Sequence, residues 1–410
     1  MNLEIIAPRD WEGALLPAWN DLLANASEPS VFLSPEWVGA WWRVYGEGRV
    51  PRLLAAWGRD GALVGLAPFY LRRLRLGGLP GPRVLALMGD EAVGSEYLGV
   101  LVRPGHGERF ISGLVQALGD DWSLADFCGL REGGILAELL EQLFASRNPR
   151  RTHREIEPCS LIPLPDDYET YLRSLNPKFR STLRYRTNKL LKNFSVRLLR
   201  TGREEDLSEH LESFFALHQR RWIAQGEPGL FYDTRMRAFY QDVSPAILRR
   251  GWLRFYHLEV NGVIRASQFG FVHDGIIHSL QETFDHSFHP PGVGGVGVIL
   301  RGMAIRESIE EGLKAYDFLA GTEDFKTRWG TTTHHVRRLR IGAPGVVGGL
   351  AFCSTAGWRA TKDWSRAHLP AWIFRVRDGW RARILARKAG RLVAESEGTK
   401  SWPSRLGGLR

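Results

Sequence analysis

The sequence predicts an α/β protein, of the α+β kind, with two tandem domains of one design and a basic helical tail. Two observations lead there: an order of strands, glycine loop and helix that occurs twice, and a charge excess confined to the C-terminus. A chain of 410 residues has room for two or three domains. We expect the first domain at residues 1–163, the second at 164–342 and the tail at 343–410.

Each predicted domain has a mixed, mainly antiparallel sheet that opens with a hairpin. Residues 53–71 place two apolar strands around the Asp60–Gly61 turn. Residues 252–272 place two more around Asn261–Gly262. Asp-Gly and Asn-Gly between apolar runs are strong hairpin signals because both turn residues tolerate a positive φ.

In both domains a third strand is expected to lead through glycines into a helix, followed by a short strand that contains Asp-Phe. In the first domain these elements are a strand at 97–102, a loop at 104–107, a helix ending at Leu118 and a strand at 125–129. In the second they are a strand at 276–284, a loop at 291–297, a helix ending at Gly312 and a strand at 316–321. This recurrence predicts an internal repeat. The alternative is that two ordinary α/β units share the same order of elements by coincidence.

Helices are expected to flank both sheets. Asp10 is a candidate N-cap, and Pro35 suits the first turn of a second helix. Apolar residues at helical spacing predict two further helices, at 177–194 and 204–225.

The net charge of +10 is located rather than spread. Residues 358–410 hold 13 Arg or Lys and four Asp or Glu, so the rest of the chain is close to neutral. One internal segment, 173–203, has ten basic residues and no acidic one. Anionic partners are therefore expected at these two places, and not over the whole surface.

The three cysteines, Cys128, Cys159 and Cys353, are odd in number and far apart. They predict neither a disulfide framework nor a metal site, and they favour a reducing cytosol. A transmembrane helix is not expected, because no charge-free apolar stretch of about 18 residues occurs.

The glycine loop at 291–297 is the most informative segment. Glycines between a strand and a helix leave backbone N–H groups free to bind a phosphate or pyrophosphate. The predicted cofactor-binding residues are Gly292, Val293, Gly294, Gly295, Val296 and Gly297. A tight turn that needs small residues for packing is the alternative. The first-domain loop is expected to be structural, because Glu108 would repel an anion there.

The order of these elements resembles the core of the GNAT N-acyltransferase superfamily. Short motifs narrow the resemblance to the bacterial acetyltransferases called CelD-like, associated with cellulose biosynthesis, which are similar to the Fem-type aminoacyl transferases with two tandem GNAT-like domains. These motifs are Phe32–Trp37, Phe214–Trp222, Pro291–Gly292, Tyr316–Gly321 and Phe325–Gly330. The resemblance spans about residues 1–342 and implies acetyl-CoA or another acyl-CoA as cosubstrate, bound by the second domain.

Four residues are candidates for the chemistry. Glu282 is a candidate base on the strand before the glycine loop, and Asp317 a candidate for orienting an amine. Lys326 matches the lysine that the Fem-type resemblance ties to phosphate binding and acyl transfer. His218 is expected to reach the cleft between the domains. Each residue has a structural alternative. Glu282 could be an ordinary surface carboxylate and Asp317 a strand carboxylate paired with an arginine or a backbone N–H. Lys326 could be a solvated surface lysine and His218 a helix histidine with its hydrogen bonds satisfied.

The acceptor is expected to lie against basic helices. Lys178, Arg180 and Arg184 could hold acceptor phosphates, an acidic glycan or tRNA, or could simply form a solvated helix face. Arg221 and Trp222 are the other candidate substrate-binding residues. No metal site is expected, because His286 and His289 lack cysteines or carboxylates at zinc spacing.

Three functions are compatible with this pattern. The first is transfer of an acyl group from acyl-CoA to an amino group of a sugar, a polysaccharide or a cell-envelope precursor, in the cytoplasm. The second is a Fem-type transfer from aminoacyl-tRNA, the one case in which nucleic acid is a partner. The third is a non-catalytic scaffold, whose Trp- and Arg-rich tail lies on the inner face of the membrane. The oligomeric state is left open.

Overall fold

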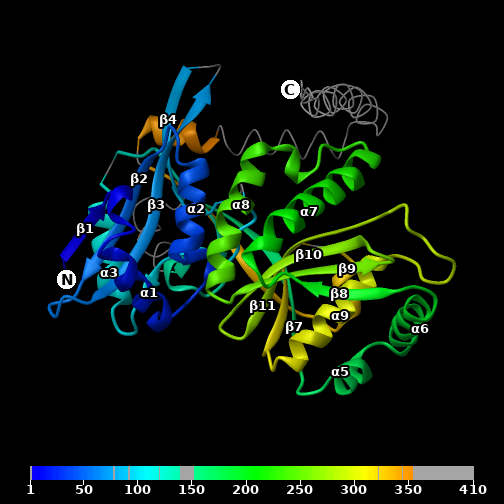
Figure 1. Cartoon of the computed structure of the whole chain (residues 1–410). Helices are drawn as coiled ribbons and strands as arrows, with labels where there is room; N and C mark the ends of the chain where they lie inside the picture. The colour runs from blue at the N-terminus through cyan, green and yellow to red at the C-terminus, as the bar shows by residue number, and fades with distance from the viewer. Residues whose placement is uncertain are drawn as a thin grey trace, which may run out of the picture.

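The protein is known from a computed structural model, which describes residues 2–76, 79–90, 93–119, 121–138, 152–321, 323–343 and 345–353. The basic segment 358–410, with most of the predicted tail, lies outside these ranges. A sheet runs through the molecule with helices on both of its faces (Figure 1). The predicted mixed α/β fold is thus confirmed. None of the helices in the described ranges is long and apolar enough to cross a membrane.

The first half matches the predicted hairpin and one of the two predicted helix starts. Its elements are β1 (Asn2–Ile6), η1 (Pro8–Asp10), α1 (Leu15–Asn25), η2 (Val31–Leu33), α2 (Pro35–Tyr45), β2 (Val50–Trp57), β3 (Leu63–Leu76), β4 (Leu79–Leu87), β5 (Leu101–Val102), α3 (Gly107–Ala117), β6 (Leu124–Arg131) and β7 (Thr152–Pro163). Pro35 opens α2, and the Ser34 hydroxyl accepts a hydrogen bond from the Trp37 amide at 3.2 Å. Asp10 caps nothing: it ends η1, and α1 begins at Leu15.

The second half contains both predicted long helices. Its elements are α5 (Tyr168–Ser174), α6 (Pro177–Asn193), β8 (Val196–Arg200), α7 (Glu204–Ala224), η5 (Leu230–Tyr232), α8 (Thr234–Arg249), β9 (Leu253–Val260), β10 (Val263–His273), β11 (Ile276–Phe284), α9 (Val296–Glu310), β12 (Ala315–Ala320), η6 (Lys326–Trp329) and β13 (Thr332–Gly342). Helices α6 and α7 end within one residue of their predicted ends.

The predicted repeat is present, with one strand reassigned. Strand β4 pairs in parallel with β6 across helix α3, just as β11 pairs in parallel with β12 across helix α9. The third strand of the first half is therefore β4, and not the segment 97–102. Within that segment only β5 is a strand, and it pairs with β3. Its apolar residues, such as Leu98 and Val100, are buried in the core although the rest of the segment is irregular.

The two halves each lend a strand to the other. The sheet order is β1-β2-β3-β4-β6-β13-β7-β12-β11-β10-β9-β8. Strand β13, from the end of the second half, pairs with β6, whereas β7, from the end of the first half, pairs with β12. The two exchanged strands also pair with each other, from Thr332 opposite Leu161 to Ile341 opposite Thr152. The expected boundary near Pro163 therefore lies at the end of a strand that hydrogen-bonds to the second half.

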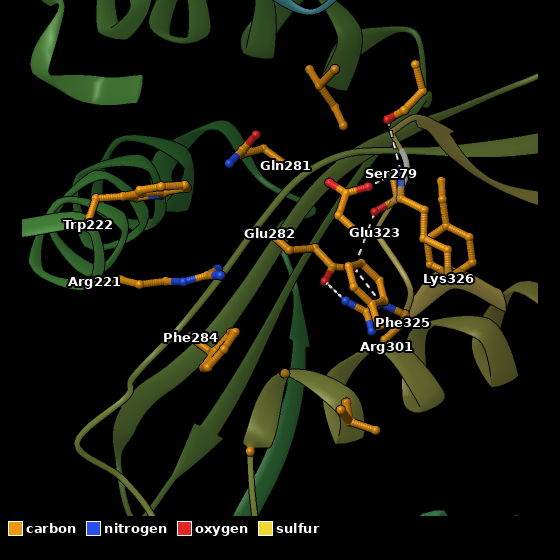
Figure 2. A pocket seen from close by; sticks show the side chains of 16 residues that line it. Arg221, Trp222, Ser279, Gln281, Glu282, Phe284, Arg301, Glu323, Phe325 and Lys326 are labelled. Atoms are coloured by element: carbon orange, nitrogen blue, oxygen red, sulfur yellow. Dashed lines mark hydrogen bonds and ion pairs between the residues drawn. The ribbon is translucent and has the colours of Figure 1, made fainter. Parts of the chain in front are cut away.

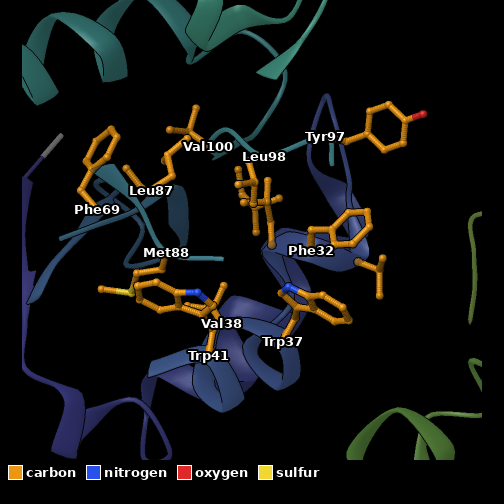
Figure 3. Close-up of a cluster of buried hydrophobic side chains, with 14 of the residues drawn as sticks. Phe32, Trp37, Val38, Trp41, Phe69, Leu87, Met88, Tyr97, Leu98 and Val100 are labelled. Carbon is orange, nitrogen blue, oxygen red and sulfur yellow. The ribbon is translucent and has the colours of Figure 1, made fainter. Parts of the chain in front are cut away.

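One hydrophobic core joins the halves. It includes the aromatic cluster of Figure 3, where Phe32 and Trp37 pack with their ring centroids 5.0 Å apart. The ring of Trp37 in α2 lies 5.0 Å from that of Phe239 in α8, so the cluster extends into the second half. A second core lies on the opposite face of the second-half sheet, under α5, α6 and α9. The sheet is thus covered by α7 and α8 on one side and by α9 and α6 on the other (Figure 1).

Candidate functional site

Strands β11 and β12 separate after three residue pairs. They run parallel from Ile276 opposite Ala315 to His278 opposite Asp317, and beyond that point they diverge. A cavity of about 530 Å³ lies between them. Its walls come from β11, the end of β12, the first turns of α9, the last turn of α7 and the segment 323–326 (Figure 2). Such a wedge leaves strand N–H and C=O groups that a ligand can pair with.

Glu282 faces this cavity but is engaged by an arginine. The guanidinium of Arg301, on α9, donates through Nε to Glu282 Oε1 at 3.0 Å and through Nη2 to Oε2. Arg301 is only 8% exposed and lies over the Phe325 ring, 4.3 Å from its centroid. Burial alone would lower the pKa of Arg301, but the charge and hydrogen bonds of Glu282 raise it. The pair fixes the carboxylate, so Glu282 can accept an N–H from a ligand only while sharing its oxygens with Arg301.

Lys326 is a buried cation on the opposite wall. Its side chain is 6% exposed, and its Nζ donates to the Ala320 carbonyl at 2.9 Å. It also pairs with Glu323, at 3.0 Å. The ammonium thus marks the end of β12, where a developing negative charge in the cavity would meet it.

His218 stands behind the cavity wall. It is fully buried in α7, and its Nε2 lies 3.1 Å from the side-chain nitrogen of Gln281, which does line the cavity. Burial, aided by the charge of Arg221, lowers the pKa of His218 to about 4. The imidazole is therefore neutral at pH 7, and it reaches the cavity only through Gln281.

Arg221 and Trp222, both predicted to bind substrate, line the cavity from the last turn of α7. Figure 2 shows Arg221 extending toward Glu282, above Phe284. Its guanidinium lies 4.4 Å from the centroid of the Phe284 ring. Burial lowers the pKa of Arg221 from its ordinary value, although an arginine stays charged at neutral pH.

The glycine loop divides into core and surface positions. Val293 and Val296 are fully buried, so their side chains pack in the second core and only their backbone is available to a ligand. Gly295 caps α9 with open space around it, and Gly295 and Gly297 line the cavity. Gly292 and Gly294 adopt φ values of +75° and +69°, which a side chain disfavours.

Helix α6 brings two cations to this loop, but not the predicted ones. A Cβ at Gly294 would meet the Arg186 guanidinium at 2.9 Å, and one at Gly292 would meet Lys189 Nζ. The predicted residues lie elsewhere on α6. Arg180 donates to the carbonyl of Arg173 at 3.1 Å, and Arg184 forms an ion pair with Glu169. Neither they nor Lys178 line the cavity between β11 and β12.

Asp317 lies at the seam between the halves, in a cluster with Tyr97, His278 and the partly buried His334. The Tyr97 hydroxyl donates to Asp317 Oδ2 at 2.6 Å, and His278 Nδ1 lies 3.2 Å from the same oxygen. The Leu319 amide donates to Oδ1 at 2.7 Å, which holds Leu319 at a φ of +59° where β12 bends away from β11. Although burial opposes it, these hydrogen bonds lower the pKa of Asp317. Asp317 shapes the wedge rather than facing its cavity.

Sequence reasoning missed the residues that complete the site. Arg301 had one usable signal, because it is the single cation among the apolar residues 296–305 of α9. Tyr97 had none, since it meets Asp317 only across the seam. Within the described ranges, no group of three or more His, Cys, Asp or Glu side chains is placed to hold a metal ion.

Comparison with known proteins agrees with this geometry. Residues 177–327 match the acetyltransferase (GNAT) domain family. The match thus covers the part of the second half that contains β11, the glycine loop, α9 and β12. No curated protein matches the chain.

Solved structures share the fold along most of the chain. FemX is 12% identical and covers 82% of this chain and 97% of its own, with a TM-score of 0.55. A conserved protein of unknown function from Bacteroides thetaiotaomicron is 13% identical and covers 84% of this chain and 100% of its own, with a TM-score of 0.51. Identities this low show a common fold and nothing further.

Proposed function

We propose that the second half transfers an acyl group, in the first place acetyl, from acyl-CoA to an amino group of a sugar, a polysaccharide or a cell-envelope precursor. The observation that carries the proposal is the wedge between β11 and β12, which opens onto the glycine loop at the start of α9. We place the reaction in the cytoplasm, with peripheral membrane contact through residues 343–410 as the accompanying prediction.

The glycine loop suits the phosphates of the donor. Free N–H groups at the start of α9 and the positive end of its dipole favour an anion there. Arg186 and Lys189 flank the same loop, and the open space at Gly295 leaves the backbone accessible. The donor would supply an acyl thioester, whose chain the cavity between the strands has room to take.

The cavity walls offer complementary groups for the transfer. The acceptor nitrogen bonds to the acyl carbon and the thioester C–S bond breaks. The proton that the amine loses ends on the CoA sulfur, which leaves as the thiol. Glu282, which Arg301 holds in place, can orient the amine by accepting a hydrogen bond from one of its N–H groups. Lys326 supplies positive charge at the end of β12, where an oxyanion would be stabilised.

The donor site is tested at Gly295. Gly295→Asp places a carboxylate at the N-terminus of α9, where no neighbouring atom obstructs it. We expect acetyl-CoA affinity to fall at least 100-fold by calorimetry, which is about 2.7 kcal/mol, with the melting temperature nearly unchanged. Gly294→Asp is a poorer test, because the positive φ and Arg186 would strain any side chain.

The matched control is Gly107→Asp, at the start of α3 in the first half. A Cβ there meets only Ile135, at an ordinary 3.6 Å. It should leave acetyl-CoA affinity as in the wild type. Unchanged affinity of a folded Gly295→Asp variant would refute the donor site.

A Fem-type transfer from aminoacyl-tRNA is the second candidate, and the fold shared with FemX favours it. It predicts no heat with acetyl-CoA but retention of charged tRNA on the wild-type protein, and loss of retention on an Arg186→Gln, Lys189→Gln variant. A scaffold without catalytic function predicts binding of neither donor.

A further inference from the structure

The guanidinium of Arg221 lacks an anionic partner among the described residues. Glu282 and Asp285, which each line a cavity together with Arg221, are both engaged by other arginines: Glu282 by Arg301, and Asp285 by Arg265 at 2.7 Å. Arg221 Nε is buried and makes no hydrogen bond within the described structure. Leaving a buried donor unsatisfied is costly, so such a group marks a place where a ligand is expected to bind.

The Arg221 guanidinium makes cation–π contacts with two aromatic rings. It lies 4.4 Å from the Phe284 centroid and 5.8 Å from that of Trp222. These cation–π contacts satisfy none of the N–H donors of the guanidinium, so the donors remain available for other contacts. A planar fork of donors matches a carboxylate or a phosphate, which accept two parallel hydrogen bonds.

Arg221 stands between two cavities. One is the cavity between β11 and β12, and the other is a smaller one of about 200 Å³ that shares Arg221 and Phe284 as walls. The smaller cavity is also lined by Arg220 and His286, with Asp285 as its carboxylate. Its volume is less than half that of the larger cavity, and it has room for a phosphate or carboxylate group.

We propose that Arg221 binds an anionic group of the acyl acceptor, a carboxylate or a phosphate, so that the acceptor's amine lies in the larger cavity beside Glu282. The acceptor class is then an amino acid or an amino-sugar phosphate, and not a neutral amine. The assignment to the acceptor rests on the proposed function. The donor has its own cations, because Arg186 and Lys189 flank the glycine loop from α6, across the sheet from α7 (Figure 1).

The test compares matched pairs of small amines by calorimetry on protein saturated with CoA. Glucosamine 6-phosphate against glucosamine reports a phosphate site, and glycine against glycinamide reports a carboxylate site. We expect the wild type to prefer the anionic member of one pair at least tenfold. Arg221→Gln should reduce this preference to less than threefold, and Arg221→Lys should keep part of it.

Arg203→Gln is the control for charge. It removes one cation from the other end of the same helix, about 27 Å away at 1.5 Å per residue, where Arg203 pairs with Asp206. It should keep the full preference. CoA affinity, measured first, tests the proposed function separately: without CoA binding by the wild type that proposal fails. A wild type without anion preference, a preference that survives Arg221→Gln, or a loss of CoA affinity in Arg221→Gln overturns the acceptor site.

Discussion

The two halves differ most in the connection between their third strand and the following helix. In the first half this connection, from Leu87 to Gly107, is long and crosses to the other half, where the Tyr97 hydroxyl meets Asp317. In the second half it runs from Phe284 to Val296 and forms the glycine loop beside the cavity. One topology thus carries two different connections: the first packs Tyr97 against the other half, and the second borders the larger cavity.

The two halves also differ in how the aspartate of the Asp-Phe strand is bound. Asp126, on β6, accepts two hydrogen bonds from Arg338 of the exchanged strand β13, at 2.7 and 2.6 Å. Asp317, on β12, accepts from Tyr97 and from the Leu319 amide. Each carboxylate accepts a hydrogen bond from the other half, but the cavity beside β12 is the larger of the two, about 530 Å³ against about 220 Å³ beside β6.

Replacing each carboxylate by alanine gives the largest expected effects. Asp126→Ala takes the bidentate partner from Arg338. Asp317→Ala leaves the Leu319 amide without its acceptor, and it removes one of the two partners of the Tyr97 hydroxyl, the other being His334. Both should lower the free energy of unfolding by about 3 kcal/mol. Only Asp317→Ala should also weaken acetyl-CoA binding, measured by calorimetry on folded protein. Equal loss of binding in both variants would contradict the division of roles.

Acid should destabilise the second half through His218. Because its pKa falls from 6.5 to about 4 on folding, the unfolded chain binds the proton first as the pH drops. The contribution of neutral His218 to the free energy of unfolding is therefore fully present above pH 6.5 and is lost as the pH falls toward 4. At pH 5 this loss is about 2 kcal/mol. Urea unfolding at pH 7 and pH 5 should show a smaller difference for His218→Gln. His106→Gln, in the first half, should behave as the wild type does.

Lys326 is a difference between the halves that one substitution can test, because residues 1–163 contain no lysine that could take its place. Lys326→Ala should lower turnover at least tenfold, about 1.4 kcal/mol in the barrier, with acetyl-CoA affinity unchanged. Release of CoA thiol measures turnover. Lys314→Ala removes an exposed lysine that pairs with Asp274 and should have no effect. Unaltered turnover in Lys326→Ala would contradict a catalytic role and leave Lys326 only the structural hydrogen bond to the Ala320 carbonyl.

Local patterns predicted the elements well and the contacts between them less well. The helix at 204–225 follows from apolar spacing and is present almost to the residue. Only Leu101–Val102 of the strand expected at 97–102 is a strand, because an apolar run can be buried by an irregular segment as well as by a strand. The basic segment was recognised, but Arg186 and Lys189 could not be chosen from its ten cations without knowing which side of α6 faces the loop.

The hairpins, the glycine loop and the long helices could be predicted from the sequence, since each depends on residues close along the chain, and the repeat could be predicted because these local patterns recur in the same order. The exchange of β7 and β13, the pairing of Glu282 with Arg301 and the hydrogen bond from Tyr97 to Asp317 became visible only in the folded structure. These contacts join residues between about 20 and 220 positions apart. Their partners are fixed by how sheets and helices pack, and no local pattern records that packing.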